Sequence, residues 1–327
     1  MRRRLSSLRR SFVAPLVVAL AAGARLEAQT GVFPEALPFL LPIGARSIGA
    51  GQAVVAGGGG AEALFWNPAL ISRGPREFAF NLAEQANDII GTDADIALVW
   101  PVPRVGSFAV TLRYFAEKDQ PTANDNGEQT GTLVPTGVIA AASFAAPFGN
   151  RLAAGITLKF LQLGAHCTGG CDIPPLSPRA GAVDLGIQYF LTSDSTFTIG
   201  ASAVSLGPRL QVNDSPQADP LPTRASVGVS YLPKFSSVPP DLRTRFEVDA
   251  VKRPAGGGLG YRFGGELSWQ KQYVARAGYQ LHGTTGSGPT VGVGLATDKL
   301  RIDFAQVFTD LGVGLGKPTY LSLRYVF

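Results

Sequence analysis

Hydrophobic and polar residues alternate along most of the chain. The pattern is clear in residues 107–115, where apolar and aromatic side chains share one face and polar ones share the other: Phe108, Val110, Leu112 and Tyr114 against Ser107, Thr111 and Arg113. Residues 151–161, 181–191 and 259–271 repeat it. A period of two over about ten residues is typical of strands that cross a membrane, because a soluble β-sandwich uses strands of roughly 5–6 residues.

Fourteen segments of this kind are predicted along the chain. They lie near 76–84, 93–101, 105–115, 136–147, 151–163, 181–191, 195–204, 222–232, 241–252, 259–270, 272–282, 289–297, 299–309 and 318–327. Most connections alternate between long and short, with long ones at 116–135, 164–180, 205–221, 253–258, 283–288 and 310–317. The segment 233–240 is longer than this rhythm predicts, and the first outer loop is shorter. An even strand number with long and short connections indicates a closed antiparallel barrel with both termini in the periplasm.

Residues 1–28 have a different composition from the rest. Arginines at positions 2, 3, 4, 9 and 10 precede an apolar run at 12–23, and Ala28 offers a small residue for cleavage. These features predict a secretory signal peptide, because the apolar run is too short to span a membrane as a helix. The pair Arg9-Arg10 also bears a faint similarity to a twin-arginine signal.

The positive charge of the chain belongs to this leader. The full sequence has 29 basic and 24 acidic residues, but six arginines and one glutamate lie in residues 1–28, which leaves 23 of each sign. A neutral remainder gives no indication of a nucleic-acid partner. Charged residues make up only 16% of the chain, against roughly 25% in soluble domains, yet no later apolar run reaches ~18 residues. An exported barrel in the bacterial outer membrane, surrounded by its lipid, satisfies both observations.

The last strand has a distinctive end. Apolar side chains at 321, 323, 325 and 327 share one face, and Ser322 and Arg324 share the other. A final amphipathic strand with Tyr325 and a terminal Phe327 resembles the signature that the barrel assembly machinery reads. An ordinary edge strand that happens to end in Phe is the alternative.

Residues 29–75 show little alternation and are rich in Gly and Ala until the bulky Trp66-Asn67-Pro68. A barrel of fourteen strands has a lumen wide enough to hold more than side chains. We therefore predict a luminal hatch at 29–75, between the leader and a barrel at 76–327. Glycines allow positive φ, Asn67 before proline is extended, and Pro68 opens a helical turn. Trp66 is the predicted apolar anchor of the hatch.

Charged side chains recur on the strand faces predicted to line the lumen. They include Arg113, Lys159, Asp184, Arg245, Glu247, Asp249, Arg262, Glu266, Arg276, Arg301, Asp303 and Arg324. Two interpretations remain open: an ion-paired interior that holds the hatch in the barrel, or a polar filter. Charges of both signs fit either interpretation.

Few residues suggest catalysis, a metal or a cofactor. Cys167 and Cys171 fall in a predicted outer loop and are expected to pair in an oxidising compartment, while zinc held by His166, both cysteines and Asp172 is the alternative. His282 would permit a Ser-His lipase, but no nucleophile elbow accompanies it. Gly49-x-Gly51 lacks the context of a nucleotide motif. The sequence thus predicts neither an enzyme nor a resident metal or cofactor.

The N-terminal segment resembles a known family. "GARSIGAGQAVVAGGGGAEALFWNPALI" is similar to the N-terminal motif of the PorV/PorQ family, itself similar to FadL-type outer-membrane transporters. The matching hatch residues are Gly44, Arg46, Gly49, Gly51, Ala53, Ala63, Trp66, Asn67, Pro68 and Ala69. A later match resembles the family's Arg-x-Gly-Tyr hairpin, at Arg276, Gly278 and Tyr279. Relatives usually carry acidic or polar residues where this chain has Gly57 to Gly60.

The resemblance implies a non-enzymatic outer-membrane barrel. FadL-type members pass hydrophobic molecules through a hatch-gated lumen, and PorV-type members deliver proteins exported by the type IX secretion system. The expected partner is accordingly a hydrophobic small molecule or a secreted protein. A purely structural barrel would bind neither.

Overall fold

The computed structural model describes residues 39, 41–84, 90–171, 178–211, 218–234, 239–253, 258–283, 286–308 and 317–327. The predicted leader at 1–28 lies outside the described residues, as do residues 29–38 and 40 of the predicted hatch. In the part described, no helix is long and apolar enough to cross a membrane.

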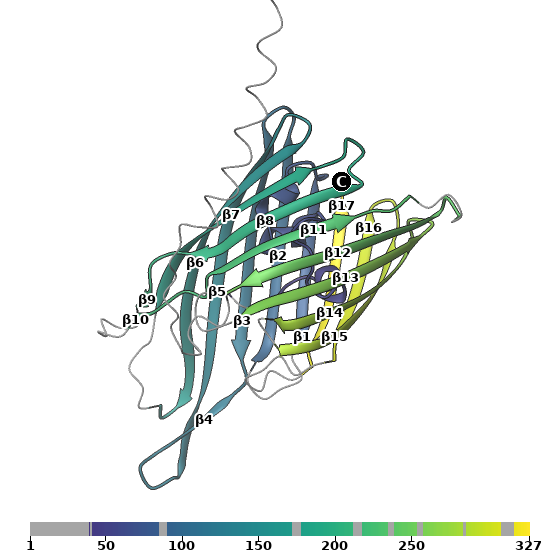
Figure 1. Cartoon of the computed structure of the whole chain (residues 1–327). Coiled ribbons are helices and arrows are strands. Elements are labelled where there is room, and N and C mark those ends of the chain that lie inside the picture. The colour runs from purple at the N-terminus through teal and green to yellow at the C-terminus, as the bar shows by residue number, and fades with distance from the viewer. Residues whose placement is uncertain are drawn as a thin grey trace, which may run out of the picture.

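Fourteen antiparallel strands form a closed barrel (Figure 1), which confirms the predicted fold class. They are β1 (Glu77–Glu84), β2 (Ile90–Val102), β3 (Gly106–Glu117), β5 (Gln129–Phe148), β6 (Leu152–Gly169), β7 (Arg179–Phe190), β8 (Phe197–Leu206), β11 (Arg224–Tyr231), β12 (Leu242–Lys252), β13 (Leu259–Trp269), β14 (Tyr273–Gly283), β15 (Gly286–Ala296), β16 (Leu300–Val307) and β17 (Thr319–Val326). Each pairs with its neighbours along the chain.

The barrel closes between the first and last strands. β1 pairs with β2 on one side and with β17 on the other, so that Phe78 faces Leu98 and Tyr325 in register. Closure gives each wall strand a hydrogen-bonding partner on both sides. This is the condition for β-structure inside hydrocarbon, where no water can satisfy a free edge.

Side chains sort between the two faces of the wall as the alternation predicts. On β3, Val110 and Leu112 are exposed on the outer surface, whereas Thr111 and Arg113 are buried in the lumen. The outer face carries aromatic residues near the rim where the chain ends, including Trp100, Phe148, Trp269, Tyr273 and Phe327. An apolar band with an aromatic girdle is typical of barrels in a bilayer.

The two ends of the barrel differ in the length of their connections. We call the end at which β17 finishes the C-terminal rim, and Figure 1 shows the C-terminus at this end. Short turns join β2 to β3, β5 to β6, β13 to β14 and β15 to β16 there. The connection from β11 to β12 at 232–241 is longer than these turns, and it includes the segment 233–240 that departs from the predicted alternation of long and short connections.

Two predicted loops contain more strand than expected. β5 begins at Gln129 and β6 ends at Gly169, so both continue far into the segments predicted as loops at 116–135 and 164–180. A short strand, β4 (Gln120–Ala123), pairs with β5. We call 118–135 with 164–171 the extension, and Figure 1 shows it projecting from the barrel opposite the C-terminal rim. The predicted loop at 205–221 holds two short strands, β9 (Leu210–Gln211) and β10 (Ala218–Asp219).

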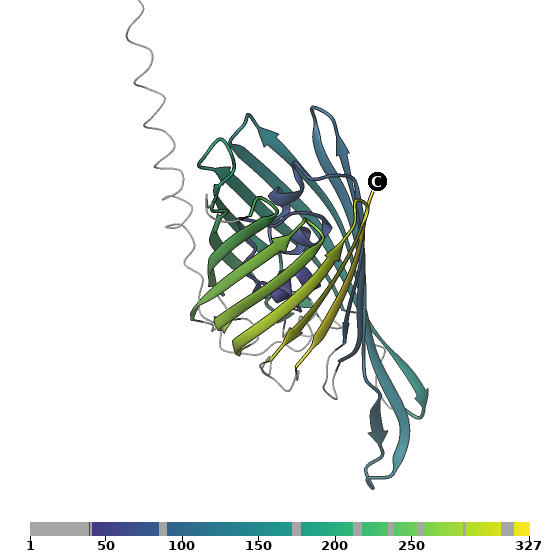
Figure 2. The same cartoon turned by 90° about the vertical axis from the view of Figure 1, so that its right-hand side faces the viewer.

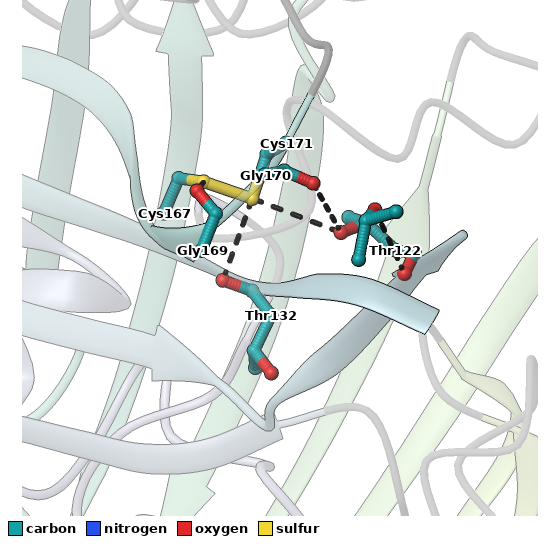
Figure 3. Close-up of a disulfide and its surroundings, with 7 residues drawn as sticks. Thr122, Thr132, Cys167, Gly169, Gly170 and Cys171 are labelled. Carbon is teal, nitrogen blue, oxygen red and sulfur yellow. Dashed lines mark hydrogen bonds between the residues drawn. A yellow bond between two sulfur atoms is a disulfide. The ribbon is translucent and has the colours of Figure 1, made fainter. Parts of the chain in front are cut away.

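A disulfide joins Cys167 to Cys171 at the tip of β6 (Figure 3). The ring between them is tight, and Gly169 takes a φ of 87° that favours glycine. Gly170 donates from its backbone N–H to the Thr130 carbonyl at 2.9 Å and accepts from the Thr122 hydroxyl at 3.3 Å. Because both sulfurs are bonded to each other, neither is a thiolate for the alternative zinc site.

Replacing both cysteines, Cys167→Ser with Cys171→Ser, should loosen the extension and leave the barrel closed. Closing a ring this short lowers the chain entropy of the unfolded extension, which raises the free energy of the unfolded state by about 2 kcal/mol at 25 °C. Hydrogen exchange in 120–135 should become faster, while the heat-modifiable migration of the barrel on gels stays unchanged. Equal exchange in both proteins would contradict a stabilising role of the disulfide.

Candidate functional site: the luminal segment

Residues 41–72, here called the luminal segment, lie inside the barrel, as the purple ribbon in Figure 2 shows. The segment contains a short helix, α2 (Ala45–Gly49), and two 3-10 turns, η2 (Ala61–Phe65) and η3 (Pro68–Ile71). Most of its side chains are buried, and the strands around it carry polar side chains on their inner faces. An irregular backbone at this depth requires hydrogen-bonding partners from the wall.

Asn67 ties the segment to itself and to the wall. Its backbone is extended, with φ −157°, and its Oδ1 accepts from the N–H of Ala69 at 3.0 Å, which caps η3. Its Nδ2 donates to the carbonyls of Val55 at 2.7 Å and Ile187 at 2.9 Å. Pro68 follows at the first position of η3, where its missing N–H is harmless. The Asn-Pro pair therefore joins a turn, a distant part of the segment and β7.

Trp66 fills the space between the two halves of the segment. Its side chain is only 2% exposed and packs with α2 in an apolar cluster that includes Ile48 and Val54. Its Nε1–H donates to the Ile43 carbonyl at 3.3 Å. The guanidinium carbons of Arg224 and Arg262 lie 5.2 and 5.4 Å from ring centroids of the indole, close enough for cation–π attraction.

Lumen-facing glycines let the segment approach the wall closely. A Cβ added to any of six of them would collide with the backbone or side chains of the segment: Gly155, Gly186, Gly200, Gly264, Gly278 and Gly292. Gly155 faces Pro68 and Ala69, Gly186 faces Asn67, and Gly200 faces Val55 and Ala56. On the other side of the lumen, Gly264 faces Ala50, Gly278 faces Gly51, and Gly292 faces Gly49. Glycine inside a strand weakens it, so its use here fits a wall shaped around a second backbone. We did not predict these wall glycines from the sequence, although their spacing on inward-facing positions was a signal.

Polar side chains of the wall accept hydrogen bonds from backbone N–H groups of the segment. Asp249 Oδ2 accepts from the N–H groups of Val54 at 2.9 Å and Val55 at 3.1 Å. The Thr290 hydroxyl accepts from the Gly51 N–H at 3.1 Å, and Ser322 Oγ accepts from the Ala45 N–H at 2.8 Å. These bonds replace those that water would supply to an exposed loop.

A chain of ion pairs links the segment to four neighbouring strands. Arg276 contacts Glu266 at 2.8 Å and Asp303 at 2.6 Å, and Arg324 contacts Asp303 at 2.7 Å. From the segment, Arg46 lies 3.2 Å from Glu266, and Glu62 lies 3.6 Å from Arg324. Alternating signs offset the desolvation of each charge in the buried network.

The network changes the proton affinity of the two charges on the segment. Burial raises the pKa of Glu62, and the attraction of Arg324 only partly counteracts it. Burial lowers the pKa of Arg46, but Glu266, Glu247 and Asp303 outweigh this, so that its pKa lies above the ordinary value. Arg46 therefore stays charged at physiological pH.

The other predicted lumen charges lie at different depths. Glu247, Asp249, Arg276, Asp303 and Arg324 are buried in the lumen, whereas Arg301 is exposed near the C-terminal rim. Arg245 is half-buried, 3.9 Å from Glu247. The structure thus brings Glu266, Arg276, Asp303 and Arg324 together with the segment and leaves Arg301 apart. In the described residues, no group of three or more His, Cys, Asp or Glu side chains could hold a metal ion.

Part of the lumen is apolar, which the sequence analysis did not predict. On the side toward the extension, buried apolar side chains from several strands and from the segment before β11 form a cluster: Phe115, Ile139, Leu161, Ala180, Ala182, Leu210 and Leu221. Phe39 packs against this cluster. Phe115 follows Arg113 on the same face of β3, so the change from polar to apolar was visible in the sequence.

A small pocket lies between this cluster and Trp66. Its walls are mainly apolar, with Phe39, Leu41, Phe65, Ile139 and Val204, and three cations border it: Arg113, Lys159 and Arg224. Arg113 pairs with Asp93, and Lys159 lies 2.7 Å from Asp184. In this conformation the pocket has room for about one water molecule. A larger guest would fit only after the segment or the pocket walls moved.

Several solved outer-membrane structures share this fold. The toluene transporter TbuX of Ralstonia pickettii superposes with a TM-score of 0.56 at 15% identity, over 87% of this chain and 98% of its own. The toluene transporter TodX of P. putida gives 0.58 at 13%, over 87% and 98%. A FadL homologue of Pseudomonas aeruginosa gives 0.50 at 11%, over 88% and 99%. No protein-family model matches the chain, and no curated protein does either.

Gly186→Ala should displace the Asn67-Pro68 corner without opening the barrel, because the new methyl group would collide with the Asn67 amide and lie 2.8 Å from Pro68 Cδ. Overpacking of this kind costs about 1–3 kcal/mol. Hydrogen exchange of 67–72 should accelerate in proportion.

Gly181→Ala provides the matched control on the same strand. A methyl group there meets only the Lys159 carbonyl oxygen, at 3.9 Å. Exchange in 67–72 should equal that of the unmodified protein. If both variants left exchange unchanged, the close fit of segment to wall would be wrong.

Proposed function

We propose that this chain is an outer-membrane barrel that passes hydrophobic small molecules and that residues 29–75 act as its hatch. The apolar pocket beside Trp66 carries the proposal, because it joins an apolar part of the lumen to the segment that fills the rest. Pockets for small apolar ligands combine such walls with a few polar groups. The similarity in fold to toluene transporters and a FadL homologue supports the same class of substrate.

In this proposal the luminal segment is the closed state of a gate. Gly58 and Gly59 have φ values of 91° and 133°, and an added Cβ would meet at most one atom within 4 Å at either position. Of the four glycines between the wall-bound residues 45–56 and the corner at 66–68, these two have the most open space around the α-carbon, and Arg46 Nη1 donates to the Gly59 carbonyl at 3.2 Å. Movement about these glycines would widen the pocket while β1 stays in place. The luminal ion pairs and the disulfide have a supporting role, and no catalytic step is proposed.

Val204→Trp tests this function by filling the pocket. With toluene and oleate as probes, binding to the detergent-solubilised protein should weaken about 5- to 150-fold, as expected from roughly 1–3 kcal/mol of overpacking. Titration calorimetry measures the change for each probe. Unchanged affinity would place the ligand elsewhere and remove the pocket from the proposal.

Val227→Trp is the control, because Val227 is 56% exposed on the outer face of the neighbouring strand β11. It adds the same side chain without reaching the lumen, so probe affinity should stay the same. Heat-modifiable migration establishes that both variants are folded barrels.

A second candidate is delivery of a secreted protein, as the resemblance to the PorV/PorQ family implies. The extension favours it, since β4 is mostly exposed and pairs with β5 beyond the barrel, and a disulfide lies at the end of β6, the other neighbour of β5. Native mass spectrometry of the protein from its own cells separates the two functions. A bound apolar ligand supports passage, and a bound secreted protein that is lost on deleting 118–135 supports delivery.

A further inference from the structure

The C-terminal rim has an uneven distribution of charge. Going around the barrel, the segment before β1, the turn from β2 to β3 and the turn from β5 to β6 are consecutive. They contain Arg73, Arg76, Arg104 and Arg151 and no acidic side chain, against one backbone carboxylate at Phe327. We call these three stretches, 72–76, 102–106 and 148–152, the arginine sector.

The remaining four turns of this rim are neutral in sum. They contain Asp194, Lys234, Asp241, Lys271, Asp298 and Lys299, three cations and three anions. Lys234 and Asp194 form an ion pair at 2.5 Å. Arg243 and Arg301 lie nearby but occupy inward-facing positions of β12 and β16. Summed over the turns, the net positive charge of this rim thus comes from the arginine sector.

The arginine sector is solvent-accessible and adjoins the outer face of the wall. Arg73, Arg104 and Arg151 are exposed. The guanidinium carbon of Arg76 lies 3.4 Å from a ring centroid of Trp100 and 4.6 Å from that of Phe327. Both rings point outward, with 45% and 56% of their surface exposed. Arg76 therefore sits at the level where the apolar band of the wall ends.

Aromatic rings and arginines at this level fit a particular neighbour. Indole and phenyl rings settle at the boundary between acyl chains and headgroups, and arginine side chains reach from there toward phosphate. Guanidinium groups bind phosphate with charge-assisted hydrogen bonds. A soluble acidic protein would use the same charges but would gain nothing from the outward-facing rings beside them.

We infer that the arginine sector binds the headgroups of anionic phospholipids in the leaflet at the C-terminal rim. This inference rests on the proposed function only in that the chain spans an outer membrane with this rim at the periplasmic side. Arg104 and Arg151 supply charge toward phosphate, and so does the exposed Arg73, whose Nη2 donates to the Gly149 carbonyl at 2.8 Å and whose guanidinium carbon lies 5.2 Å from the Phe190 ring centroid. Arg76 is occupied between Trp100 and Phe327 and fixes the aromatic part of the surface. The preference should concern headgroup charge, since the rest of the rim is neutral.

The test compares two triple variants with the same change in net charge. Arg73→Gln with Arg104→Gln and Arg151→Gln removes the charge of the sector, and Arg76 is kept because it contacts the end of β17. Lys234→Gln with Lys271→Gln and Lys299→Gln removes three charges from the neutral turns. Heat-modifiable migration checks that each full-length variant is a folded barrel.

Native mass spectrometry of the full chain in mild detergent measures the occupancy of added phosphatidylglycerol and phosphatidylcholine. The unmodified protein should bind phosphatidylglycerol more tightly than phosphatidylcholine. Each arginine near an anionic headgroup contributes roughly a fewfold in affinity, so the arginine triple variant should lose about tenfold or more for phosphatidylglycerol only. The lysine triple variant should stay within about twofold of the unmodified protein.

Three results would overturn the inference: no preference for phosphatidylglycerol, equal losses in both variants, or equally tight binding of water-soluble glycerophosphate. The last would indicate a site for soluble anions. Toluene and oleate affinities, measured on the same samples, report on the proposed function separately. If the unmodified protein shows no preference for phosphatidylglycerol but binds the probes normally, only the arginine sector is rejected. If it prefers phosphatidylglycerol but binds neither probe, only hydrophobic passage is rejected.

Discussion

The pairing of β1 with β17 is the constraint on which the rest of the structure depends. In hydrocarbon an unpaired strand edge leaves N–H and C=O groups without any partner, at several kcal/mol for each group. Closing the sheet removes both edges at once and creates an interior separated from lipid. Polar groups buried inside the wall then draw partners from the protein, and the lumen holds ion pairs, wall glycines and a fitted segment.

The luminal segment shows two ways of filling such an interior. Toward β13–β17, charges of alternating sign run from Arg46 to Asp303 and Arg324, and backbone N–H groups donate to Thr290 and Ser322. Toward β6–β8, contact is made by backbone against glycine, with Asn67 as the main polar link. Wall glycines admit the segment on both sides, and the ion pairs of Arg46 and Glu62 are added on the first side only. Apolar guests are compatible with the second side, where the pocket and the apolar luminal cluster also lie.

How far the sequence predicts this protein depends on the range of the interactions involved. Alternation within a strand is local, so the strands, their inward and outward faces and the closed barrel followed from the sequence with small errors in the bounds. The extension was missed because its residues, such as Gln120 and Gly131, do not alternate regularly between apolar and polar side chains. The role of the wall glycines was also missed, because the residues that pack against them are far away in the sequence. Trp66, Asn67 and Pro68 stood out because bulky residues are rare in their surroundings, yet their partners on β7 and β11 could not be inferred from composition.

The hydrogen bond from Ala45 to Ser322 spans 277 positions of the chain, and that from Gly51 to Thr290 spans 239. The luminal segment therefore leaves the ribosome early, whereas its partners on β15 and β17 are synthesised last. Before the last strands are made, these residues lack their partners on the wall, and their high content of glycine and alanine gives them little tendency to form structure alone. The luminal segment is thus translated before the strands that bind it, and it can take its place in the lumen only when those last strands are present.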